Sequence, residues 1–96
     1  MAGEKIEIEN VLQPGKTYRV DAGKFAAARA ALLAILPKTS PGLTQKEMGA
    51  AMRAALPLDQ FPGSTSGWWM KSAQLDLEAK GLIIREPTKP LRWHLP

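Results

Sequence analysis

The sequence predicts a mainly helical α+β domain in which three helices are followed by a two-stranded hairpin. Apolar residues recur at helical spacing in three segments, and they alternate with polar residues in two short segments near the C-terminus. Ninety-six residues is the length of one domain. The expected helices span residues 22–36, 45–56 and 65–80, and the expected hairpin spans residues 82–95, with strands over 82–86 and 91–95.

The first twenty residues predict an extended arm rather than a helix. Ile6 and Ile8 alternate with glutamates, and this period of two is typical of extended chain. The Pro14-Gly15 pair interrupts the segment at its middle. We therefore expect the chain to consist of an N-terminal arm over residues 1–20 and a helical domain over residues 21–96.

Each expected helix has start and stop signals in the sequence. Asp21 is an expected N-cap, because its carboxylate can accept from free backbone N–H groups. Thr44 and Glu47 have the T-x-x-E spacing of a capping box. The third helix has candidate caps among residues 63–66. The expected stop signals are Pro37, Pro57 and Gly81.

The core is expected on one face of each helix. Met70, Ala73 and Leu77 share a face of the third helix, which we assign to the core. Phe61 is the expected anchor of the loop over residues 58–63. On the last strand, Leu91, Trp93 and Leu95 are expected to face the core, while His94 faces the other way as a solvated or hydrogen-bonded histidine.

Composition excludes several kinds of site. The chain has no cysteine, which excludes thiol nucleophiles and cysteine-ligated metals, and its single histidine excludes a multi-histidine metal site. No nucleophile occurs with a base and an orienting group, so we expect no enzyme, no cofactor and no metal. The longest apolar run, Ala30–Leu36, is too short to span a membrane, and no apolar stretch follows the N-terminus. We expect a cytoplasmic protein without membrane contact.

The positive charge is concentrated at the C-terminus. The formal net charge is +4, and residues 80–96 contain four basic side chains against Glu86 alone. Lys89 lies at the expected turn of the hairpin, and Arg92 lies on its second strand. Basic residues there suit phosphate contact, which gives salt-dependent and sequence-independent affinity. The alternative is a solvated hairpin whose charges protect its edges.

The junction between the third helix and the hairpin resembles that of a known superfamily. The string Leu77-Glu78-Ala79-Lys80-Gly81-Leu82-Ile83 is similar to the L-E-x-x-G-L-I junction between recognition helix and wing in winged helix-turn-helix proteins. With the order of the elements, this resemblance covers about residues 22–95. The strings Gly67-Trp68-Trp69 and Pro90-Leu91-Arg92-Trp93-His94 also resemble a group of small bacterial proteins without an assigned function.

The winged-helix resemblance implies that the protein binds duplex DNA, in the manner of a small bacterial transcriptional regulator. The helix over residues 65–80 would enter the major groove, and the hairpin would act as a wing on the phosphate backbone. A homodimer would place two such helices on adjacent half-sites. The candidate DNA contacts are Trp68, Lys71 and Ser72 on the third helix, Lys89 and Arg92 on the hairpin, and Gln45 and Lys46 at the start of the second helix.

The outward face of the third helix also supports a different function. Trp68 and Leu75 share that face, although helices that read base edges are usually polar there. Either Ile6 and Ile8 of the arm or a partner protein would cover the two side chains. In this alternative the chain is a protein-interaction or dimerisation module that does not bind DNA. The two functions predict different results. Binding to DNA should weaken as the salt concentration rises, whereas binding to a protein partner should be lost in Trp68→Ala.

Overall fold

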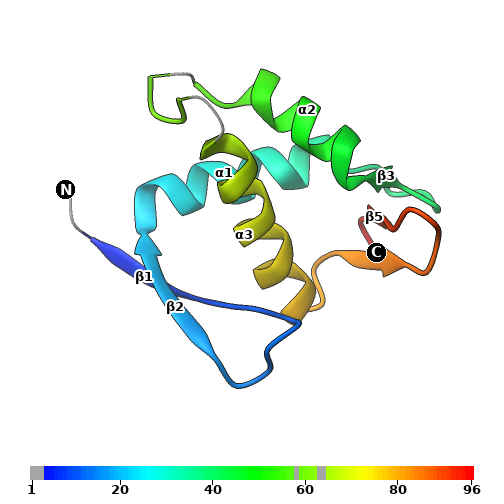
Figure 1. Ribbon diagram of the computed structural model, residues 1–96, viewed down its shortest axis with the longest axis horizontal. Helices are drawn as coiled ribbons and strands as arrows, with labels where there is room; N and C mark the ends of the chain where they lie inside the picture. The colour runs from blue at the N-terminus through cyan, green and yellow to red at the C-terminus, as the bar shows by residue number, and fades with distance from the viewer. Residues whose placement is uncertain (1–3, 58, 63–64) are drawn as a thin grey trace.

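The computed structural model describes residues 4–57, 59–62 and 65–96 (Figure 1). The mainly helical α+β class is confirmed: the described residues form three helices and two small sheets. Each helix ends one residue earlier than predicted, since its cap residue leaves the helix. The elements are β1 (Lys5–Glu9), β2 (Thr17–Asp21), α1 (Ala22–Ile35), β3 (Leu43–Thr44), α2 (Gln45–Ala55), α3 (Thr65–Ala79), β4 (Ile84–Glu86) and β5 (Arg92–His94).

The arm is a β-hairpin. Strands β1 and β2 pair antiparallel, with Ile6 opposite Val20 and Ile8 opposite Tyr18. Because residues paired across two strands point to the same side, these four side chains share one face of the hairpin. Ile8 and Val20 are buried in the core of the molecule, whereas Ile6 and Tyr18 are exposed.

The predicted C-terminal hairpin is present as β4 and β5, which pair antiparallel, but its sheet has a third strand that was not predicted. Its strand order is β3-β5-β4, with antiparallel neighbours throughout. The unpredicted strand is β3, where Leu43 pairs with Trp93 and Thr44 pairs with Arg92. A strand of two residues is too short to produce an alternating pattern, so nothing in the local sequence indicates it.

The predicted caps of α1 and α2 are confirmed. The Asp21 carboxylate accepts from the Lys24 backbone N–H at 2.8 Å. At α2, the Thr44 hydroxyl accepts from the Glu47 N–H, and the Glu47 carboxylate accepts from the Thr44 N–H, which completes the capping box. Residues 63 and 64, which contain two of the candidate caps for α3, lie outside the described residues.

A Schellman motif ends α3. Gly81 has a φ of 73°, its N–H donates to the Glu78 carbonyl, and the Leu82 N–H donates to the Leu77 carbonyl. Leu82 is therefore part of the helix-ending turn and not of a strand. This is why β4 begins at Ile84, two residues later than predicted.

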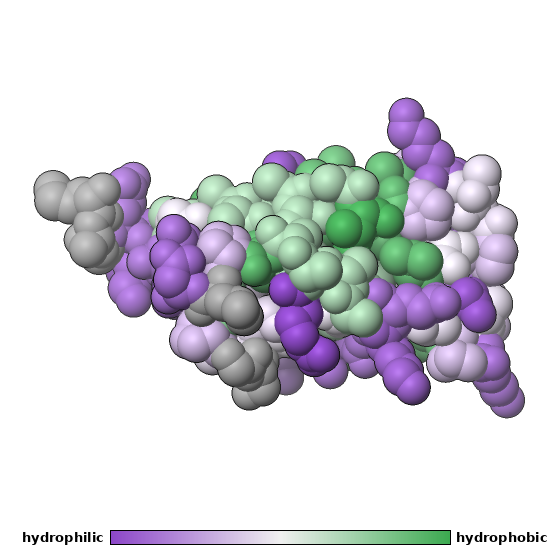
Figure 2. Space-filling model, turned by 90° about the horizontal axis from the view of Figure 1, so that it is seen from above, coloured by the Kyte–Doolittle hydropathy of each residue, from purple (hydrophilic) through white to green (hydrophobic). Residues whose placement is uncertain are grey.

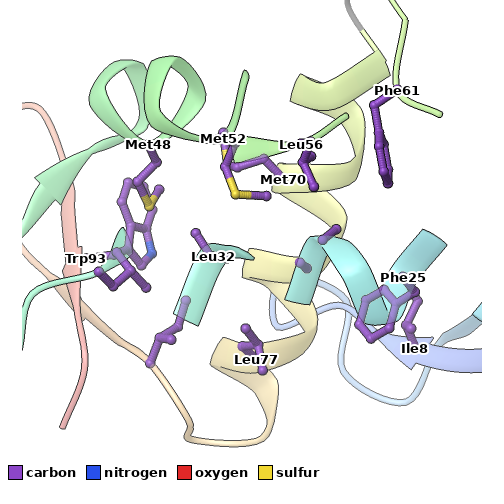
Figure 3. Packing of buried hydrophobic residues seen from close by; sticks show 14 of the residues in the cluster. Ile8, Phe25, Leu32, Met48, Met52, Leu56, Phe61, Met70, Leu77 and Trp93 are labelled. Carbon is purple, nitrogen blue, oxygen red and sulfur yellow. The ribbon is translucent and has the colours of Figure 1, made fainter. Parts of the chain in front are cut away.

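One core lies among the three helices, and Figure 3 shows side chains from each of them pointing into it. Met70, Ala73 and Leu77 are buried, as the periodicity predicts. Phe61 is buried as the predicted loop anchor, and its ring meets the Trp69 ring edge-on at 6.1 Å. The prediction for the last strand is right for the buried Trp93 and wrong for Leu91, which is 39% exposed because it precedes β5 and lies beside the turn.

Helix α3 crosses α1 and lies between the two sheets, with the β1–β2 hairpin on one side and β4 and β5 on the other (Figure 1). In the view that looks down on α2, apolar residues gather in the middle of the face (Figure 2). The exposed α2 residues include Ala50, Ala54 and Ala55, whose methyl groups offer little area for burial against a partner. No helix in the described ranges is long and apolar enough to cross a membrane.

Candidate functional site

A pocket of about 600 Å³ separates the β1–β2 hairpin from the outward face of α3. Its volume is within the range of small-molecule sites. The structure brings the predicted residues Trp68, Lys71, Ser72, Leu75 and Ile8 together in this pocket. The full lining consists of Gly67, Trp68, Lys71, Ser72 and Leu75 of α3 and of Ile8, Glu9, Asn10, Tyr18, Arg19 and Val20 of the hairpin.

A buried carboxylate holds the hairpin against α3. Asp76 is fully buried, and its Oδ1 accepts from the Glu9 backbone N–H at 2.8 Å. Its Oδ2 accepts from the Lys80 ammonium at 2.9 Å. The Val11 N–H also donates to the Leu75 carbonyl at 3.3 Å. These contacts close the pocket at the end that lies toward the C-terminus of α3.

Asp76 was not identified from the sequence as a residue of the site. A signal was available, because Asp76 follows Ala73 by three positions and precedes Leu77. Both neighbours were assigned to the core, so Asp76 lies at the edge of the core face. A carboxylate in that place needs hydrogen-bond donors, and the hairpin backbone supplies one of them.

Aromatic side chains lie at the open side of the pocket. Trp68 is 56% exposed, and Tyr18 on the facing hairpin is 43% exposed. The Trp68 ring meets the Trp69 ring edge-on at 4.9 Å, and Trp69 in turn packs against Phe61, so the position of Trp68 is supported from the core. The hairpin thus half-buries Leu75 but leaves Trp68 accessible to solvent.

Lys71 of α3 is a cationic side chain that lines the pocket. Arg19 of β2 also borders the pocket, but its side chain lies with Glu7 on the opposite face of the hairpin, because side chains alternate along a strand. The ion pairs among the described residues involve neither Lys71 nor Arg19. Glu9 is the acidic residue of the lining, and its backbone already binds Asp76. The Glu9 side chain also lies on the opposite face of the hairpin, because Glu9 alternates with Ile8, so Lys71 supplies the charge that faces the pocket.

The remaining predicted DNA contacts lie together around the β4–β5 turn. Gln45 and Lys46 line a smaller hollow of about 300 Å³ together with Pro90 and Leu91. Lys89 is exposed in the turn itself. The guanidinium of Arg92 is partly engaged, since Nη1 donates to the Gly42 carbonyl at 3.0 Å and lies 3.4 Å from Glu47 Oε1.

A second carboxylate on α3, Glu78, holds the C-terminal sheet. Glu78 Oε1 accepts from the Trp93 indole N–H at 2.7 Å, from Arg85 at 3.1 Å and from the Gln74 side chain at 3.0 Å. Gln45, a predicted DNA contact, donates to the buried Gln74 at 3.4 Å. The position of the β4–β5 turn relative to α3 is therefore set by a polar network that sequence reasoning missed.

The pocket and the β4–β5 turn lie within one sequence family. The profile of a family of unknown function, DUF6958, matches residues 5–93. The chain belongs to this family. The matched range includes both walls of the pocket and ends within β5. No curated protein and no solved structure matches the chain.

In this DUF6958 protein the single histidine is buried and hydrogen-bonded. His94 Nδ1 lies 2.7 Å from the Leu95 carbonyl, and Nε2 lies 3.1 Å from Glu86 Oε2. The Leu95 carbonyl and then the Glu86 carboxylate raise the pKa of His94 above its ordinary value near 6.5. Hydrogen bonds from His94 and from Ser40 lower the pKa of Glu86 below its ordinary value of 4.5. Among the described residues, no group of three or more potential metal ligands is present.

The His94–Glu86 pair predicts a pH-dependent stability. The contribution of His94 is fully present below pH 6.5 and is lost as the pH rises through the raised pKa of the folded state. The contribution of Glu86 is present above pH 4.5 and is lost as the pH falls through its lowered pKa. We expect the melting temperature to fall between about pH 6 and pH 8, and to fall less in Glu86→Gln. Equal slopes for both proteins in thermal melts would contradict this assignment.

Proposed function

We propose that this DUF6958 protein is a winged-helix protein that binds duplex DNA, in the manner of a small bacterial regulator. The observation that carries the proposal is the order of the elements: three helices are followed at once by the β4–β5 hairpin. A winged helix has this layout, with the third helix as its recognition helix. The L-E-x-x-G-L-I junction lies where the layout requires it, at the end of α3.

Free positive charge near the β4–β5 turn supports contact with phosphates. Of the four bases in residues 80–96, Lys80, Arg85 and Arg92 are in ion pairs with acids of the same chain. Lys89 in the turn and Lys46 at the start of α2 are exposed, and the ion pairs of the described residues include neither. We assign the main phosphate contacts to these two lysines.

The α3 residues would supply the contacts within the groove. Lys71 and Ser72 can donate hydrogen bonds to base edges, and the Trp68 ring can pack against thymine methyl groups. The outward face of α3 carries no carboxylate in the pocket, because Asp76 and Glu78 are turned toward the two sheets. The acidic residues of α3 therefore do not oppose the approach of DNA.

The test is a fluorescence-anisotropy titration of labelled random duplex DNA at two salt concentrations. We expect salt-dependent binding, and we expect the double variant Lys46→Glu, Lys89→Glu to bind at least about tenfold more weakly, with a salt slope smaller by about 2. The matched control is Arg29→Glu, Arg53→Glu, which makes the same change in charge on exposed residues of α1 and the distal end of α2. Equal losses in both double variants, or no binding at low salt, would refute the proposal.

An interaction module without DNA binding is the second candidate, and the exposure of Trp68 favours it. Trp68, Tyr18 and Ile6 together expose a large apolar area beside Leu75, and such areas commonly mark interfaces. In this function Trp68→Ala abolishes capture of a partner or a second copy, whereas the lysine reversals have no effect. Sedimentation velocity on the wild type and on Trp68→Ala distinguishes a homodimer from a monomer.

A further inference from the structure

We propose that the pocket between the hairpin and α3 binds a small organic anion with an aromatic or aliphatic body. The inference goes beyond DNA binding and does not require it. Apolar side chains from both walls form most of the surface on which the body of the ligand would lie, including Ile8, Val20 and Leu75. Lys71 would bind its acidic group.

The shape of the pocket favours a small molecule over an extended peptide. A peptide groove has two open ends, through which the chain enters and leaves. This pocket is closed at one end, where Glu9 and Val11 bind the backbone and side chain of α3. Its volume of about 600 Å³ matches that of sites for small ligands.

The aromatic residues at the opening are suited to a planar ligand. Trp68 on α3 and Tyr18 on β2 face the same space from opposite walls. Trp68 is held by its edge-on contact with Trp69, so its ring is oriented before a ligand arrives. An aromatic body between the two rings would bury area that is now in contact with water.

The charges of the pocket determine which ligand it accepts. Arg19 lies opposite Glu7 on the face of the hairpin that points away from Ile8 and Val20, so neither of these charges faces the pocket. Lys71 is exposed, and the ion pairs of the described residues do not include it, so its ammonium is available to one carboxylate or sulfonate. A single ammonium that faces the pocket matches a monoanion.

Occupation of the pocket would also affect DNA binding if the proposed function holds. The ligand would cover Trp68 and Lys71, which the duplex needs on the same face of α3. Binding of the ligand and of DNA would then be mutually exclusive at that face. Because the ligand is measured without DNA, failure of the DNA proposal leaves this inference intact, and failure of ligand binding leaves the DNA titration unaffected.

The experiment uses two fluorescent probes that differ in charge. The probe 8-anilinonaphthalene-1-sulfonate is an aromatic monoanion, and N-phenyl-1-naphthylamine is the same ring system without the sulfonate. We expect saturable binding of the anion to the folded protein, with energy transfer from tryptophan. The neutral probe is expected to bind about tenfold more weakly, since it forms no charge-assisted hydrogen bonds.

Two variants and a control locate the site. Lys71→Gln is expected to weaken binding of the anionic probe about tenfold and to leave binding of the neutral probe unchanged. Ser72→Phe is expected to weaken both probes, because the new ring fills the space beside Trp68. The control is Lys38→Gln, an exposed lysine between α1 and β3 that does not line the pocket. Circular dichroism and urea midpoints confirm that each variant is folded.

Three results would overturn the proposal. The first is no saturable binding of the anionic probe to the wild type. The second is equal binding to the wild type and to Ser72→Phe, which would place the probe elsewhere. The third is a wild-type dimer that Ser72→Phe dissociates and that excludes the probe, which would make a second copy of the chain the occupant.

Discussion

Replacing Gly42 with alanine is expected to lower the free energy of unfolding by about 3 kcal/mol or more. Gly42 has a φ of 93°, which is unfavourable for a residue with a Cβ. An added Cβ would also lie 1.9 Å from the Trp93 carbonyl oxygen and 2.5 Å from its carbon. These are backbone atoms, so no change of rotamer relieves the clash. Strands β3 and β5 would have to separate, and Trp93 would leave its place in the core.

Two other glycines separate the causes of this effect. Gly81 has a φ of 73° but open space around its Cβ position, so Gly81→Ala is expected to cost only about 1–2 kcal/mol. Gly49 is helical and an added Cβ would lie 3.9 Å from the Met70 methyl carbon, so Gly49→Ala is expected to stabilise by about 0.5–1 kcal/mol. Urea denaturation of the three variants measures the series. If Gly42→Ala costs no more than Gly81→Ala, the close approach of β3 to β5 is wrong.

The helices could be predicted because their signals are local. The capping box joins Thr44 to Glu47 across three residues, and the Schellman motif joins Leu77 to Leu82 across five. Strand β3 could not be predicted in this way. Its contacts reach across fifty residues, as between Leu43 and Trp93, and two residues of extended chain carry no periodicity of their own.

For the same reason, the sequence predicts only one of the two walls of the candidate site. The 3.6-residue period of a helix places Trp68, Lys71 and Leu75 on one face, and the structure shows them in one pocket wall. The facing wall depends on where the hairpin docks. That position is set by contacts distant in sequence, such as Glu9 with Asp76, so Tyr18 and Val20 gave no sign that they belong to a site.

Two carboxylates in the last turns of α3 place both sheets. Asp76 binds the hairpin backbone, and Glu78, two residues later, binds Trp93 and Arg85. If Asp76 and Glu78 were charges on the free surface of α3, they would repel DNA from that helix. As internal anchors they leave Lys71 as the charged residue of the α3 face that lines the pocket. The same arrangement makes the pocket and the β4–β5 hairpin dependent on neighbouring residues of one helix.

Replacing Asp76 with alanine is expected to lower the free energy of unfolding by about 2–4 kcal/mol. The change leaves the Glu9 N–H without its buried acceptor and removes the partner of Lys80. We expect the loss to act first on the hairpin, because Glu9 is held to α3 through this carboxylate. Hydrogen exchange should therefore accelerate more at the β1 amides than at the β4 amides. The affinity for the anionic probe should fall as the β1 amides lose their protection from exchange.

Asp76→Asn keeps the shape of the side chain and covers the case in which the alanine variant does not fold. Its Oδ1 can still accept from the Glu9 N–H, while its amide group faces the Lys80 ammonium in place of a carboxylate oxygen. We expect a smaller loss of stability than in Asp76→Ala, with most of the β1 protection retained. The matched control is Asp59→Asn on the exposed α2–α3 connection, where a change within about 0.5 kcal/mol is expected. If the β1 amides exchange no faster in Asp76→Ala than in the wild type, Asp76 does not anchor the hairpin, and the wall of the pocket is held by the burial of Ile8 and Val20 and by the Val11–Leu75 hydrogen bond.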